Sequence, residues 1–116
     1  MDLIPPQPLQ KAAVFELAEL AARRASTGDR WLEFFRTGTL RTGLYVLPVE
    51  GVDDQNPHTE DEVYYVIDGR AVLDIDGEDH PVAPGSVLYV RAQVPHRFHS
   101  IREELLVLVF FASGKG

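Results

Sequence analysis

Cysteine is absent from this chain of 116 residues, so disulfide bonds, cysteine-ligated zinc sites and thiol nucleophiles are excluded. Basic residues are also few: 11 lysines and arginines stand against 18 aspartates and glutamates, which gives a formal net charge of −7. Nucleic acids and anionic membrane surfaces both require a basic footprint on a protein partner. The composition therefore argues against nucleic acid and against a membrane as partners.

Long hydrophobic runs are missing as well. No segment approaches the ~18 consecutive apolar residues of a membrane-spanning helix. The proline-rich N-terminus lacks the basic region and the apolar core of a signal peptide. We therefore expect a cytoplasmic protein. The remaining composition, 45% hydrophobic and 25% charged, is ordinary for one globular domain that buries its core without disulfides.

The N-terminal part of the sequence predicts an extension followed by one helix. Three prolines near the start keep the first residues extended. Residues 9–25 are rich in alanine, leucine and glutamate, and their apolar residues recur at helical spacing. Gly28 is expected to end the helix. We therefore assign residues 1–29 to an N-terminal extension and an amphipathic helix.

The rest of the chain, residues 30–116, predicts β-structure. Apolar, β-branched and aromatic segments are separated by glycine or proline turns roughly every 8–12 residues, a pattern typical of a small sandwich or barrel. Asp68-Gly69 and Asp76-Gly77 are dipeptides favoured in hairpin turns. We predict an all-β domain of some eight short strands, at residues 31–36, 44–49, 63–67, 71–76, 80–83, 86–90, 96–101 and 105–112.

Two histidines and a carboxylate suggest a metal site. On a regular strand, side chains alternate with period two, so His58, Glu60 and Glu62 share one face with Tyr64. A carboxylate directed among apolar residues is costly unless it is paired or bound to a cation. His96 begins another strand, and two imidazoles with a carboxylate suit a divalent metal. The same spacing also fits a plain surface ion pair.

These two stretches resemble the two motifs of the cupin superfamily. The first motif ends in Glu, six residues and Gly, which Glu62 and Gly69 match, and His58 falls on its second histidine. Asn56 stands where the first histidine is expected. In the second motif, His96 matches the histidine, while the usual proline, glycine and asparagine are replaced. The resemblance covers roughly residues 43–111.

The resemblance implies a cupin double-stranded β-helix (jelly-roll barrel), preceded here by the N-terminal helix and usually assembled as a homodimer. It also implies that His58, Glu62 and His96 hold a divalent metal ion, with zinc, iron, manganese and nickel all open. The departure at Asn56 leaves the fourth position to Asn56, Gln55 or water, or leaves the site without a metal. Glu60 is a further candidate for that position or for the pocket, and equally for an acidic rim.

Several other residues are candidates for the pocket wall, and each also has an ordinary structural explanation. Tyr64, Phe98 and Ser100 share the parity of ligand residues and are candidates for the pocket wall. Tyr45 and Trp31 could extend an apolar wall, although aromatic residues such as these and Tyr64 and Phe98 are more often core. Two histidines receive structural interpretations: a surface or dimer-interface position for His99 and a solvated hairpin for His80.

Two functions of different class follow from these observations. The first is a metal-dependent cupin that acts on or binds a small organic molecule, by dioxygenase-, isomerase- or lyase-like chemistry. The second is a non-catalytic cupin that binds or senses a small ligand and has a degenerate metal site, as Asn56 suggests. The fold itself does not choose between them.

Overall fold

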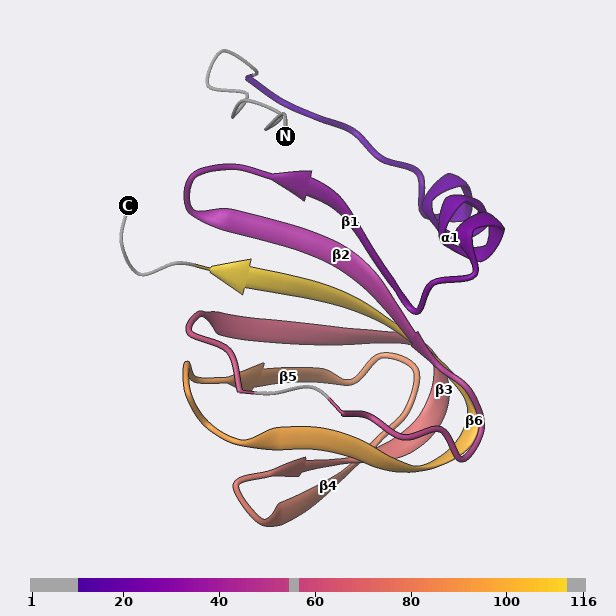
Figure 1. The fold of residues 1–116 in the computed structure, drawn as a ribbon, viewed down its shortest axis with the longest axis vertical. Coiled ribbons are helices and arrows are strands. Elements are labelled where there is room, and N and C mark those ends of the chain that lie inside the picture. Colours follow the sequence, from indigo (N-terminus) through magenta and orange to yellow (C-terminus); the bar gives the residue numbers. More distant parts are fainter. Residues whose placement is uncertain (1–10, 55–56, 113–116) are drawn as a thin grey trace.

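The computed structural model describes residues 11–54 and 57–112. Within these ranges the chain forms one helix and six strands (Figure 1). In chain order the elements are α1 (Leu17–Thr27), β1 (Trp31–Arg36), β2 (Leu40–Leu47), β3 (Asp61–Ile75), β4 (Glu78–Val82), β5 (Val87–Val90) and β6 (His96–Ala112).

The helix α1 starts later in the chain than the predicted residue 9. Residues 11–16 are described and are not helical. Phe15 instead packs edge-on against two aromatic rings of β1, with centroid distances of 4.9 Å to Phe34 and 5.7 Å to Phe35. This tertiary contact holds the segment before Leu17 in a non-helical path. The predicted stop is confirmed, because Gly28 adopts the left-handed conformation (φ 77°) that caps the helix.

All strands pair in antiparallel fashion, in the order β1-β2-β6-β3-β4, and β5 also pairs with β3. The two long strands β3 and β6 pair twice. Residues 61–68 of β3 lie against residues 106–112 of β6, and residues 72–75 lie against residues 96–99. Both strands bend between these regions and contribute to both layers (Figure 1). This arrangement is the predicted jelly-roll barrel.

The eight predicted strands become six because two predicted breaks do not exist. Asp68-Gly69 is not a hairpin turn: β3 runs through it, and the register shifts there mark bulges. Gly69 has φ 98°, and a Cβ at this position would lie 2.7 Å from the Cα of Leu105. Glycine is therefore required where β3 bends over β6. The predicted turn at Asp76-Gly77 is confirmed, since Ile75 pairs with Glu78 across it.

The core lies between the two layers of the barrel. Among the described residues, four polar or charged side chains are buried beside it, namely those of Thr42, Asp53, Glu62 and His96. The apolar core cluster consists of Leu47, Tyr64, Val66, Ala71, Leu73, Val82, Val90, Phe98, Ile101, Leu105, Val107, Val109 and Phe111.

No helix within the described part of the chain is both long enough and apolar enough to cross a membrane.

Candidate metal centre

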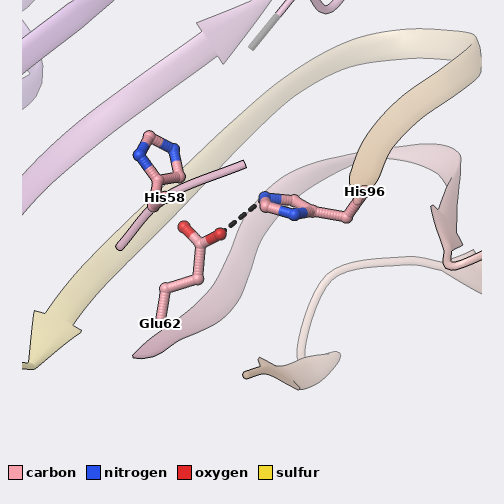
Figure 2. A group of neighbouring side chains, drawn as sticks. All are labelled: His58, Glu62 and His96. Carbon is pink, nitrogen blue, oxygen red and sulfur yellow. Dashed lines mark ion pairs between the residues drawn. The ribbon is translucent and has the colours of Figure 1, made fainter. Parts of the chain in front are cut away.

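Three side chains that are distant in sequence meet inside the barrel. His58 lies in the loop before β3, Glu62 is near the start of β3, and His96 is the first residue of β6. Each offers a ligand atom, and these atoms all lie within 4.8 Å of one another. Figure 2 shows the Glu62 carboxylate and the His96 ring turned toward each other, with the His58 ring beside them. The arrangement brings together the three residues that the sequence nominated as metal ligands.

Backbone hydrogen bonds hold the two histidines near each other. The N–H of Gln93, in the loop before β6, donates to the carbonyl of His58 at 2.7 Å. The N–H of Ala92 donates to a carboxylate oxygen of Asp61 at 2.8 Å. The first bond joins the loop that carries His58, and the second joins the start of β3, to the loop that leads into His96. The His58 ring also packs edge-on against Phe111, 4.8 Å away.

The orientation of His96 is set by its own Nδ1 atom. This atom lies 2.9 Å from the carbonyl oxygen of Val94, which can only accept, so Nδ1 carries a proton. Nε2 then faces inward, 2.5 Å from Oε1 of Glu62 and 3.1 Å from the hydroxyl of Tyr64. Burial alone lowers the pKa of His96, but the Glu62 carboxylate and the Val94 carbonyl outweigh it and raise that pKa.

Glu62 is an enclosed carboxylate with few means of stabilisation. Its side chain and that of His96 are each 1% exposed. Despite the short contact with His96, neither Glu62 oxygen accepts a hydrogen bond of ordinary geometry from the described residues. A buried carboxylate in this state is costly. In the neutral form of His96, the Nε2 lone pair faces the carboxylate directly, so a proton or a cation must lie between the two groups.

The donor set fits a divalent metal. Two imidazole nitrogens and one carboxylate oxygen are the ligands of many catalytic zinc sites and of non-haem iron sites. Ligand atoms on one tetrahedral zinc ion lie roughly 3.3 Å apart. The observed spread of up to 4.8 Å is wider, by a margin that side-chain rotation can close. Val94 supplies the outer hydrogen bond that typically orients a metal-bound histidine.

Of the other proposed ligands, the structure describes only Glu60, which does not join this group. Gln55 and Asn56 lie outside the described residues. Glu60 is engaged by Arg41, whose guanidinium donates to both carboxylate oxygens at 2.6 and 3.1 Å. These hydrogen bonds with Arg41 hold the pKa of Glu60 below its usual range. Glu60 precedes the first residue of β3, so the strand alternation that placed it in the cavity does not apply to it.

The structure places the three expected pocket-wall residues differently. Tyr64 and Phe98 are each 1% exposed and belong to the core, although the Tyr64 hydroxyl reaches His96. Ser100 is exposed, and its hydroxyl lies 3.0 Å from Nδ1 of His99. The left-handed backbone at Ser100 (φ 52°) interrupts the alternation on which its inward placement depended. Ser100 therefore does not line the cavity at the three ligands.

A pocket of about 210 Å³ adjoins the three-residue group and shares His58 with it. Trp31 and Tyr45, two of the aromatic residues named as possible wall residues, line it. Arg41 also contributes, with its guanidinium 4.3 Å above the Phe111 ring. Sequence reasoning missed Arg41, because nothing in the sequence indicates that β2 places it beside His58. The lining residues are Trp31, Arg41, Tyr45, His58, Val109 and Phe111.

Asp53 is a second residue that the sequence did not reveal. It is 3% exposed, although it lies in a polar loop next to the exposed Asp54. Its carboxylate accepts hydrogen bonds from the Tyr45 hydroxyl and from the backbone N–H of Phe98, both at 2.8 Å. Burial, with the charge of Asp53, raises the pKa of Tyr45. Asp53 thus fixes one wall of the pocket to the start of β6.

The sequence matches a known protein family. Residues 43–111 match the model of the cupin domain, and this chain belongs to that family. An uncharacterised protein of Streptomyces coelicolor, SCO3923, is 47% identical over 98 residues, which are 84% of this chain and 93% of that protein.

Two solved structures show the same fold. An RmlC-like cupin from Shewanella frigidimarina superimposes with a TM-score of 0.66 at 15% identity, covering 73% of this chain and 76% of that one. The DMSP lyase DddQ from Ruegeria pomeroyi also gives a TM-score of 0.66, at 18% identity, over 78% of this chain and 51% of that one. At these identities the likeness concerns the fold alone.

Proposed function

We propose that this protein is a small metal-binding cupin that binds or acts on a small organic molecule beside a divalent metal ion. His58, Glu62 and His96 would hold the ion. The observation that carries the proposal is the buried Glu62 carboxylate, which faces two imidazoles and accepts no ordinary hydrogen bond from the described residues. A cation at this point compensates a charge that is otherwise expensive to bury.

The adjoining pocket supports a role for an organic molecule. His58 belongs both to the ligand group and to the pocket lining, so a molecule in the pocket lies next to the proposed metal. Bound zinc, manganese or nickel supplies a Lewis acid or an activated water, and bound iron can activate oxygen. The chain's own residues orient the molecule and keep bulk water from Glu62 and His96, which are buried. Dioxygenase-, isomerase- and lyase-like reactions all remain compatible; the DddQ neighbour is a lyase.

Metal analysis of protein purified without added metal tests the proposal. We expect close to one equivalent of a divalent metal in the wild type and a background level in His58→Ala. The matched control is His80→Ala, because the His80 side chain is 41% exposed and lies 3.4 Å from Glu78, in an ion pair outside the ligand group. A wild type that carries no more metal than His58→Ala refutes the proposal.

A second function, a non-catalytic cupin that captures or senses a small ligand, is favoured by Asn56 at the place of a motif histidine. The two functions respond differently to chelation. A thermal-shift screen of small acids, sugars and phenols, with and without EDTA, separates them. Stabilisation by a ligand that is unaffected by EDTA indicates the binding module, whereas metal-dependent turnover or oxygen uptake indicates the enzyme.

We also propose that the protein is a homodimer and that it is located in the cytoplasm. The outer face of β3 and β5 carries exposed apolar side chains: Tyr65 is 41% exposed, Val87 67% and Tyr89 58%. Tyr65 and Val87 are direct partners across the two strands, so these residues form a continuous apolar stripe. We propose that a second copy of the chain covers it. Sedimentation velocity tests the dimer, and cell fractionation tests the location.

A further inference from the structure

Flat rings wall the pocket beside His58. Trp31 stands edge-on to Tyr45, with ring centroids 6.4 Å apart, and edge-on to Phe111 at 6.0 Å. All three rings line the same pocket, together with the His58 imidazole. The Arg41 guanidinium, which is also planar, lies 4.3 Å over the Phe111 ring. Most of the lining is therefore π-surface, with Val109 as its aliphatic member.

We propose that this pocket binds an uncharged molecule with a single aromatic ring, of the phenol class. The placement of that molecule beside a metal rests on the function proposed above. Size sets the number of rings: the pocket holds about 210 Å³. A cavity of about 150 Å³ suffices for benzene, whereas sites for drug-sized ligands occupy about 300–1,000 Å³. One substituted ring fits these limits.

The charges around the pocket argue against a carboxylate or phosphate as the recognised group. Arg41 is the basic side chain in the lining, and it is paired with Glu60 at 2.6 Å and with Glu33 at 3.0 Å. Arg36 also pairs with Glu33, at 2.7 Å, so two guanidinium groups balance two carboxylates. An anionic ligand would have to displace an existing partner of Arg41, which removes most of the gain from binding it.

The Tyr45 hydroxyl, which also belongs to the pocket lining, already has a hydrogen-bond partner. The Tyr45 hydroxyl donates a hydrogen bond to the Asp53 carboxylate at 2.8 Å. Asp53 is buried and also accepts from the Phe98 N–H, so it is a fixed acceptor. The Tyr45 oxygen can still accept a hydrogen bond, but it does not donate one to a ligand. A pocket whose polar donors are occupied and whose walls are aromatic selects ligands by stacking and edge-to-face contact.

Trp31 is the single tryptophan of the chain, so its fluorescence reports directly on this pocket. The experiment titrates phenol, cyclohexanol and benzoate into the full-length protein, once after metal removal and once with zinc added, and also measures each affinity by calorimetry. We expect phenol to change the Trp31 emission and to bind about tenfold more tightly than cyclohexanol, because aromatic contacts exceed simple area burial. Benzoate should bind more weakly than phenol in the metal-free protein.

A pair of variants locates the binding. Trp31→Leu keeps an apolar wall but removes the ring, and we expect it to weaken phenol binding several-fold by calorimetry. Phe15→Leu is the control, because Phe15 is 40% exposed, packs against Phe34 and Phe35 and does not line the pocket; phenol binding should be unchanged. Melting temperatures show whether both variants are folded. The wild-type comparison of phenol with cyclohexanol decides the question even if Trp31→Leu does not fold.

The outcomes separate this inference from the proposed function. Equal affinity for phenol and cyclohexanol, or a preference for benzoate in the metal-free protein, overturns the aromatic pocket, even where zinc binds to His58, Glu62 and His96. Phenol binding that is selective in the metal-free protein supports the pocket, even where no zinc binds. In that case the metal proposal fails and the pocket remains.

Discussion

The strand β6 carries two histidines, three residues apart, and each contacts a carboxylate from another strand. His96 contacts Glu62 at 2.5 Å, and His99 contacts Asp79 at 2.8 Å. The chemical groups are the same and the distances are similar. The surroundings differ, because the first two side chains are each 1% exposed, whereas those of His99 and Asp79 are 35% and 58% exposed.

Burial is what distinguishes a candidate metal site from a surface ion pair in this protein. Water hydrates Asp79 and screens its attraction to His99, so the outer pair contributes little to stability. Glu62 has no such solvent, and its charge must be compensated inside the protein. His58 provides a further ligand atom on the inner side, whereas the outer pair is joined by the hydroxyl of Ser100.

The largest expected effect is on metal affinity. His96→Ala and His99→Ala remove the same side chain from the same strand, one on each side of it. We expect His96→Ala to weaken zinc binding by at least about 100-fold, since even partners outside the ligand set often change affinity 10- to 100-fold. His99→Ala should leave it unchanged. Isothermal titration with zinc checks both, and equal losses in the two variants would remove the distinction between the pairs.

Metal removal should have the next largest effect. Zinc that binds only the folded protein at 100 times its dissociation constant adds about 2.7 kcal/mol of stability. For a domain of this size we expect EDTA to lower the melting temperature of the wild type by roughly 10 °C. His99→Ala should show the same decrease and His96→Ala almost none. A chelator response that is the same in all three proteins contradicts this prediction.

A smaller effect is expected from pH in the metal-free protein. The pKa of His96 is raised in the fold, so its contribution to stability is present below the ordinary histidine value of 6.5 and is lost as pH rises through the folded-state pKa. Glu62→Gln removes the charge responsible. Relative to this variant, the metal-free wild type should therefore lose stability as pH rises from near 6 to alkaline values. Urea unfolding at several pH values measures it; a constant difference would show that the pair does not titrate with folding.

The smallest effect is predicted for the outer pair. Asp79→Asn keeps the size of the side chain and removes its charge. Because both partners are exposed, we expect the free energy of unfolding to change by less than about 0.5 kcal/mol, with little dependence on metal. Denaturant unfolding provides the measurement. A loss above 2 kcal/mol would mean that exposure is a poor guide to the difference between the two pairs.

The family and the jelly-roll barrel could be predicted from the sequence. The alternating apolar segments and the spacing of Glu62, Gly69 and His96 are visible without knowledge of tertiary contacts. Prediction from the sequence failed where tertiary contacts override local preference. Asp68-Gly69 has the residues of a turn, yet β6 pairs with β3 on both sides of it and keeps the strand continuous. Phe15, predicted to be helical, instead packs edge-on against Phe34 of β1.

The candidate site was predictable to a similar degree. Strand alternation correctly directs Glu62 inward, and the structure brings it to His58 and His96. Alternation does not extend to Glu60, before the strand, or to Ser100, where φ is positive. The burial of Asp53 beside an exposed Asp54, and the placement of Arg41 beside His58, depend on how loops and neighbouring strands pack. No local pattern encodes those contacts.

The most direct test of the central claim is anomalous diffraction at the zinc absorption edge from crystals of the protein soaked with zinc. The account predicts an anomalous peak about 2.0–2.2 Å from ligand atoms of His58, Glu62 and His96. A peak at His99 and Asp79 instead, or no peak at the buried group while zinc is present elsewhere, would contradict it.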